Sequence, residues 1–285
     1  MSEEVNSDIM KKFRQELVIS GYSDQTKKMY LLYTKKFLNY INKPALQAKR
    51  DDIVGFMAEM KESRNLSNSS LSLIHSSLKF FFHNFLKQKI VDDVRLPKQA
   101  KKLPTVLSVK EVKELIKATE RGRNKLIVEF LYSSGVRVSE CVNMKVVDLD
   151  LNECMARVKA GKGNKDRIII LSKKWVTELK KYLNKRKKVK TEWLFSKKNG
   201  KKLSADTIQR IVRNSKETAG IQKHVTVHSL RHSFATHLLE SGENIRKIQE
   251  LLGHSNLSTT QIYTKVSEQE LKKVVSPLDR LKGIR

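Results

Sequence analysis

The 285-residue chain has few of the residues that mark secreted or membrane-spanning proteins. Its two cysteines, Cys141 and Cys154, cannot make a disulfide framework and do not have metal-ligand spacing. No segment approaches the roughly 20 consecutive apolar residues of a membrane span. The start of the chain, residues 1–7, is polar and acidic, unlike a signal or transit peptide. We therefore expect a cytoplasmic protein from a reducing compartment, with no membrane partner.

Acidic residues are also scarce relative to basic ones. The chain has 30 Asp and Glu against 58 Lys and Arg, which gives a formal net charge of +28. An excess of this size indicates a polyanionic partner, and nucleic acid is the usual one. Residues 1–100 carry a net charge of +6 and the remainder +22. Two basic parts are typical of a protein that contacts a duplex on two sides.

The first hundred residues predict a helical domain. Apolar residues at helical spacing predict a helix over residues 11–42, with Ser23 as a candidate N-cap, and further helices beginning at Asp51 and Ser67. A segment with two prolines and several lysines follows, which is typical of a linker. We predict a helical DNA-binding domain over residues 1–96 and a linker over residues 97–106.

Residues 107–285 predict a second, mostly helical domain with a small antiparallel sheet. A capping box at Ser108 and Glu111 begins its first helix, and Gly135 ends a second. Two β-type runs flank a glycine-containing turn, which predicts a hairpin. Further helices are predicted at residues 173–188, 204–219, 228–241 and 244–252, with a tail helix from residue 267. The predicted fold class is mainly α.

Six residues of this second domain form a candidate catalytic set. Two arginines could hold the non-bridging oxygens of a phosphodiester, a tyrosine could attack it, and a lysine or histidine could protonate the leaving oxygen. Nearby arginines favour the phenolate of a tyrosine, whose free pKa is about 10. The residues are Arg137, Lys162, His228, Arg231, His254 and Tyr263.

Some of these residues also have a simpler interpretation. Arg137 taken alone could be a surface ion-pair partner that Glu140 orients, and Lys162 an exposed lysine in a turn. His228 and His232 have a spacing found in metal sites, but the glutamate of the His-Glu-x-x-His motif is absent, and we expect no metal.

Four strings that contain these residues resemble the tyrosine recombinases, most closely the Xer-type site-specific recombinases of bacteria and archaea. They are Ser-Gly-Val-Arg-Val-Ser-Glu at 134–140, Gly-Lys-Gly-Asn-Lys-Asp-Arg at 161–167, His-Ser-Leu-Arg-His at 228–232, and Leu-Gly-His at 252–254 followed by Tyr263. The probability that all four strings occur by chance in this order and with this spacing is very small. Cys141 stands where a leucine is usual, an apolar replacement that leaves the catalytic set intact.

The resemblance implies a role for each residue. Tyr263 would form a 3′-phosphotyrosine, while Arg137, Arg231 and His254 would contact the scissile phosphate. Lys162 would protonate the 5′-oxygen, with assistance from His228. No cofactor or metal would be needed, because the covalent link conserves the energy of the phosphodiester.

The same resemblance implies the partners of the chain. They would be double-stranded DNA with two half-sites and other copies of the chain, four of which would exchange strands through a Holliday junction. Resolution of chromosome or plasmid dimers is the expected output. Integration of a mobile element, relaxation of DNA, and non-catalytic DNA binding are the alternatives. The target site and any accessory translocase or regulator stay open.

Overall fold

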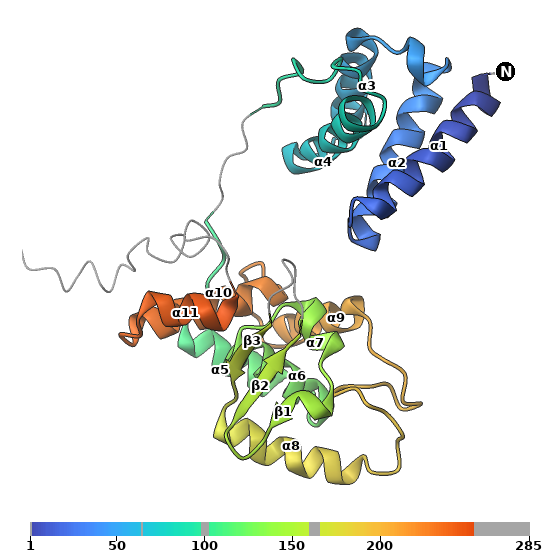
Figure 1. The fold of residues 1–285 in the computed structure, drawn as a ribbon. Coiled ribbons are helices and arrows are strands. Elements are labelled where there is room, and N and C mark those ends of the chain that lie inside the picture. Colours follow the sequence, from blue (N-terminus) through green and yellow to red (C-terminus); the bar gives the residue numbers. More distant parts are fainter. Residues whose placement is uncertain (1, 64, 98–102, 160–165, 254–285) are drawn as a thin grey trace, which may run out of the picture. The chain divides into compact units, whose positions relative to one another are not determined.

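The computed structural model describes residues 2–63, 65–97, 103–159 and 166–253, and it divides into two compact units, Met1–Lys102 and Leu103–Arg285 (Figure 1). Both units are mainly helical, and the second contains a small antiparallel sheet. The predicted fold class is therefore confirmed. Within the described ranges, no helix is both long and apolar enough to cross a membrane.

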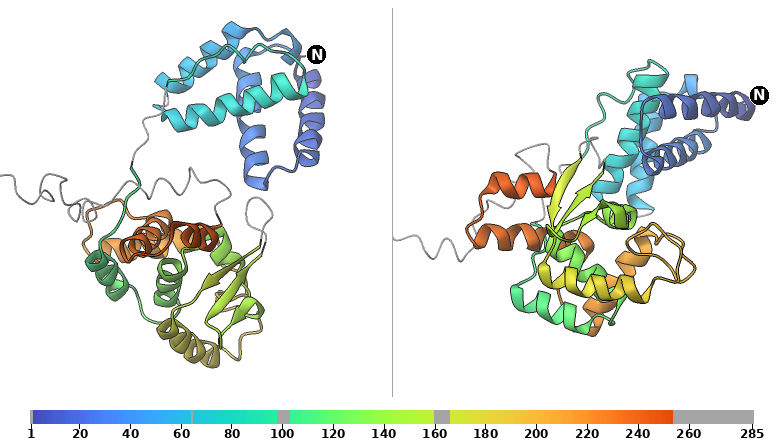
Figure 2. Two further views of the ribbon diagram at one scale, coloured as in Figure 1. Left: turned by 60° about the vertical axis from the view of Figure 1, so that its left-hand side comes forward. Right: turned by 60° about the horizontal axis from the view of Figure 1, so that its bottom comes forward.

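The first unit is a bundle in which α2 packs against α1, α3 and α4 (Figure 2). Its elements are α1 (Ser2–Ile19), α2 (Asp24–Ile41), the 3₁₀ turn η1 (Ala45–Gln47), α3 (Arg50–Glu62), α4 (Asn68–Lys79) and the π-helical turn η2 (Phe80–Phe85).

The prediction of one helix over residues 11–42 is wrong, because two helices meet within that range. Gly21 has a φ of 69°, a left-handed conformation that interrupts a right-handed helix. The hydroxyl of Ser23 then accepts a hydrogen bond from the backbone N–H of Thr26 at 3.2 Å and begins α2. The predicted N-cap at Ser23 is therefore confirmed. The end of α1 at Ile19 was not predicted.

Aromatic side chains fill the core of the first unit. Phe13 of α1 meets Phe81 edge to face with ring centroids 4.9 Å apart, and Phe37 of α2 meets Phe82 in the same way at 5.5 Å. All four rings are fully buried. Phe81 and Phe82 are consecutive, and both lie in the wider π-type turn η2, so that one turn supplies two core rings.

In the second unit, a three-stranded antiparallel sheet of order β1-β2-β3 packs with one face against the helices and leaves the other face exposed (Figures 1 and 2). The predicted hairpin is its β2–β3 pair, in which Met155 pairs with Ile170 and Val158 with Arg167. The elements are α5 (Val109–Ala118), α6 (Arg123–Ser134), α7 (Val138–Asn143), η3 (Val146–Asp148), β1 (Leu149–Asp150), β2 (Met155–Val158), β3 (Arg167–Ile170), α8 (Lys173–Lys185), α9 (Ala205–Thr218), α10 (Val227–Glu240) and α11 (Ile245–Leu252).

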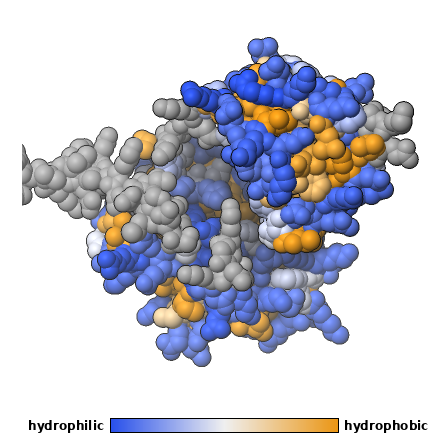
Figure 3. Space-filling model, turned by 45° about the horizontal axis from the view of Figure 1, so that its top comes forward, coloured by the Kyte–Doolittle hydropathy of each residue, from blue (hydrophilic) through white to orange (hydrophobic). Residues whose placement is uncertain are grey.

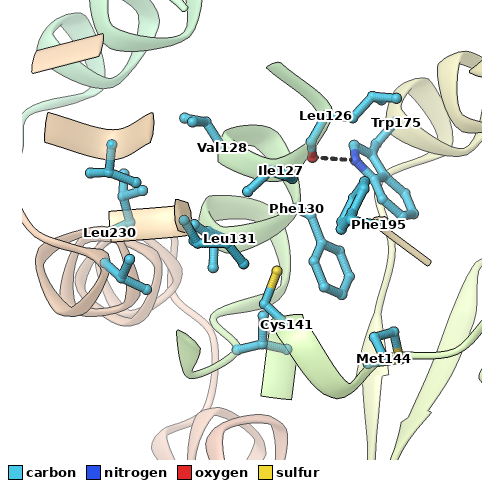
Figure 4. Packing of buried hydrophobic residues seen from close by; sticks show 14 of the residues in the cluster. Leu126, Ile127, Val128, Phe130, Leu131, Cys141, Met144, Trp175, Phe195 and Leu230 are labelled. Atoms are coloured by element: carbon cyan, nitrogen blue, oxygen red, sulfur yellow. Dashed lines mark hydrogen bonds between the residues drawn. The ribbon is translucent and has the colours of Figure 1, made fainter. Parts of the chain in front are cut away.

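Helix α6 runs through the core of this unit and packs against α5, α7, α8, α9, α10 and β3 (Figure 4). Phe130 stacks on Trp175 of α8 with ring centroids 5.0 Å apart, and the indole N–H of Trp175 donates to the carbonyl of Leu126 at 2.9 Å. Packing on so many sides holds α6 firmly. Its C-terminal end, at Gly135, therefore has a well-determined position from which the site is built.

Candidate active site

Arg137 lies at the turn between α6 and α7, as its sequence context predicts. Gly135 ends α6 with a φ of 62°, and Arg137 is the N-cap of α7. The carboxylate of Glu140 accepts the backbone N–H of Arg137 at 2.7 Å and its Nη1 at 2.8 Å. Glu140 therefore orients Arg137, while the arginine side chain keeps 28% of its surface exposed. Part of this side chain is therefore accessible from solvent.

Arg231, from α10, reaches the same turn. Its side chain is buried, with only 4% of the residue exposed. Nη1 donates to the carbonyl of Gly135, and Nη2 donates to the carbonyl of Leu252 at 2.7 Å. This guanidinium thus links α10 to the turn after α6, 96 residues earlier in the chain. It also links α10 to the end of α11.

Gly135 and Gly253 are required by close packing as well as by their backbone conformation. A Cβ atom on Gly135 would lie 2.5 Å from Cδ1 of Phe234, and one on Gly253 would lie 2.8 Å from Cδ of Arg167. Both contacts are shorter than carbon atoms tolerate without moving. The two glycines therefore allow α10 and Arg167 to approach the backbone at the site.

His228 lies in the first turn of α10, three residues before Arg231, and only part of its surface is exposed to solvent. Partial burial and the positive charges of Arg231 and Arg137 lower its pKa. Its neighbour His232 is half-buried, and burial with nearby positive groups lowers its pKa to about 4. Both imidazoles are therefore biased towards the neutral form, in which one ring nitrogen can accept a proton.

Arg167 was missed as a site residue. It begins β3, with its side chain 8% exposed, and makes a two-pronged ion pair with Glu140: Nη1 donates to Oε1 at 2.8 Å and Nη2 to Oε2 at 2.7 Å. Burial alone would raise the pKa of Glu140, but the hydrogen bonds from Arg167 and Arg137 lower it to about 2. The only sequence signal was its place five residues after Lys162 in the same motif string.

The structure brings together three of the six predicted residues, Arg137, His228 and Arg231. Lys162, His254 and Tyr263 lie outside the described residues, as does the predicted tail helix. Cys141 is buried in the core as expected, and burial raises the pKa of its thiol.

The face drawn in Figure 3 is largely hydrophilic, with smaller apolar groups between. The chain has 58 Lys and Arg against 30 Asp and Glu, so the acidic side chains are too few to neutralise all of the basic ones. The excess positive charge suits contact with a phosphate backbone.

Two family models match the chain. The Phage integrase family matches residues 105–270, and the Phage integrase, N-terminal SAM-like domain matches residues 9–92. The chain is 41% identical to Tyrosine recombinase XerA of Pyrococcus horikoshii over 276 residues, which is 96% of this chain and 94% of that protein.

Solved structures of Xer recombinases are similar as well. The crystal structure of XerA recombinase is 34% identical with a TM-score of 0.57, over 93% of this chain and 96% of that one. The XerH site-specific recombinase bound to its difH substrate is 26% identical with a TM-score of 0.70, over 87% of this chain and 78% of that one. The chain thus belongs to the phage integrase family of tyrosine recombinases, DNA breaking-and-rejoining enzymes, and is a site-specific recombinase of the Xer type.

Proposed function

We propose that this recombinase cuts and rejoins a short, nearly palindromic duplex through a 3′-phosphotyrosine on Tyr263. Arg137, Arg231 and His254 contact the scissile phosphate, Lys162 protonates the 5′-oxygen leaving group, and His228 assists the proton transfer. The chain needs no cofactor for this reaction, because the phosphotyrosine keeps the energy of the broken bond for rejoining.

The observation that supports this proposal is the link between Arg137 and Arg231. The guanidinium of Arg231 binds the carbonyl of Gly135, two residues before Arg137, and the carbonyl of Leu252, two residues before His254. One buried side chain, that of Arg231, therefore joins the turn that carries Arg137 to the C-terminal end of α11. Positive groups fixed before the reaction stabilise the extra charge of a pentavalent transition state without reorganisation.

The two units have separate tasks in this proposal. Residues 1–96 bind DNA, residues 97–106 link the units, and residues 107–285 carry catalysis and a tail helix. Both units contact the duplex, in keeping with the net positive charge of each part. Four copies of the chain on two paired sites exchange strands through a Holliday junction. The output is resolution of chromosome or plasmid dimers in the cytoplasm.

The Tyr263→Phe variant tests the nucleophile. It keeps the ring and removes the hydroxyl, so it should bind DNA as the wild type does and form no covalent product. Labelled duplex fragments selected from the sheared host genome by binding to the protein supply the substrate, and a denaturing gel detects the adduct. A covalent band with Tyr263→Phe would exclude this tyrosine as the nucleophile. Enrichment of many unrelated fragments, without one palindrome, would contradict a site-specific dimer-resolution role.

A further inference from the structure

Glu140 and Arg167 make a buried ion pair that the proposed reaction does not use. Burial of both charges costs several kcal/mol unless hydrogen bonds satisfy them, so such pairs are weak evidence for stability. Here the carboxylate is 5% exposed and the guanidinium 8%. Both oxygens of Glu140 accept from Arg167, and both also accept from Arg137. The pair is therefore fully hydrogen-bonded, and one of its contacts is a proposed phosphate-binding residue.

The third donor of Arg167 points to a different element. Its Nε donates to the carbonyl of Leu251 at 2.7 Å. The next carbonyl, that of Leu252, accepts from Arg231. Two arginines thus bind consecutive carbonyls at the C-terminal end of α11, where the negative end of the helix dipole favours cations. Gly253 follows directly and has no room for a side chain against Arg167.

The backbone position of Arg167 does not depend on its side chain. β3 pairs with β2 along its whole length, with Arg167 opposite Val158. A change of the side chain alone should leave this ladder in place and act on Glu140 and on the end of α11. Lysine cannot replace arginine here, because one ammonium group cannot bind both carboxylate oxygens and a carbonyl in the same planar fork.

We propose that Arg167 is a positioning residue for the recombination reaction: it fixes Arg137 through Glu140 and the end of α11 through Leu251, and so aligns the phosphate-binding side of the site. This inference rests on the proposed function. A misplacement of about 1 Å in an active site can lower a rate about a hundredfold. Arg167 should therefore affect the rate of cleavage and leave DNA affinity unchanged.

The test compares Arg167→Lys with Arg157→Lys. Arg157 is an exposed residue of β2, opposite Ile168 in the register, and both changes keep the net charge of the protein. Arg167→Lys should form covalent adduct about a hundredfold more slowly than the wild type, with a DNA dissociation constant within about twofold of it, because the charge that sets electrostatic affinity is unchanged. Arg157→Lys should match the wild type in both. Equal adduct rates for the two variants would overturn the inference.

A duplex with sulfur in place of the 5′-bridging oxygen distinguishes an effect of Arg167 on phosphate binding from an effect on protonation of the leaving group. A thiolate leaves without a proton, so sulfur should restore a variant that lacks the general acid. It should not restore Arg167→Lys, because the contacts of Arg167 go to the phosphate-binding side. Full restoration by sulfur would overturn the inference.

Hydrogen exchange of the full-length protein supplies a readout that needs no catalysis. Backbone amides over residues 245–253 should exchange faster in Arg167→Lys than in Arg157→Lys, since the end of α11 loses a contact. Unchanged exchange would overturn the inference. If the wild type forms no adduct while exchange changes as expected, the proposed function has failed and the positioning contact stands. If Arg167→Lys fails to fold, Glu140→Gln weakens the same ion pair and should likewise slow adduct formation.

Discussion

Replacement of Gly135 by alanine should destabilise the second unit more than replacement of a glycine whose added Cβ would contact no other atom. The glycine has a φ of 62°, where an L-residue costs about 1–2 kcal/mol. An added Cβ would also lie 2.5 Å from Cδ1 of Phe234 and 2.9 Å from Cδ2 of Leu252. Phe234 is 6% exposed and Leu252 fully buried, so neither can move aside freely. Overpacking of this kind costs about 1–3 kcal/mol more.

Gly220 provides a matched control. Its φ is 65°, it also follows a helix, and a Cβ there would meet nothing within 4 Å. Gly220→Ala should therefore lower the free energy of unfolding by about 1–2 kcal/mol. Gly135→Ala should lower it by about 2–5 kcal/mol, the sum of the conformational and packing costs. The difference between the two variants isolates the packing cost.

Urea denaturation followed by tryptophan fluorescence measures this difference. Both tryptophans of the chain, Trp175 and Trp193, lie in the second unit, so the signal reports on that unit alone. Gly135→Ala should also slow covalent adduct formation, because the carbonyl of Gly135 binds Arg231. Equal losses of stability for Gly135→Ala and Gly220→Ala would refute the reasoning, since they would mean that Phe234 and Leu252 yield without cost.

Three further predictions concern the acid, the two units and pH. Lys162→Ala should slow cleavage of an ordinary duplex far more than cleavage of the 5′-sulfur duplex, whereas Arg231→Ala should slow both alike; a lack of sulfur rescue for Lys162→Ala would exclude it as the acid. DNA affinity of the whole chain should fall more steeply with salt than that of residues 103–285, because fewer phosphates are neutralised without the first unit; equal slopes would contradict binding by both units. The pKa of Glu140 is lowered from 4.5 to about 2, so its contribution to stability is complete above pH 4.5 and disappears as pH falls towards 2. The stability difference between wild type and Glu140→Gln in urea denaturation should therefore shrink over that range, and a constant difference would show that Glu140 is not held ionised.

Local signals in the sequence were sufficient to predict most of the elements. The Ser108–Glu111 capping box begins α5, with the reciprocal hydrogen bonds at 3.2 and 2.7 Å, and Gly135 ends α6 as expected. These features depend on a few neighbouring residues, which is why they can be read without the fold. The missed break between α1 and α2 was also local, but Gly21 lies within a run of helical spacing that outweighed it.

The catalytic chemistry could likewise be predicted from the sequence, because motif order and spacing carry it. The motifs could not predict which buried side chains hold the site residues in position through hydrogen bonds. Arg231 was predicted only as a phosphate-binding residue, and the structure adds that it is buried and holds two carbonyls from distant segments. Arg167 carried no separate signal, because its partners Glu140 and Leu251 lie 27 and 84 residues away along the chain. Sequence alone determined the family and suggested its reactive groups, whereas the buried hydrogen bonds around Arg137 and Arg231 depend on long-range packing, which only the tertiary structure decides.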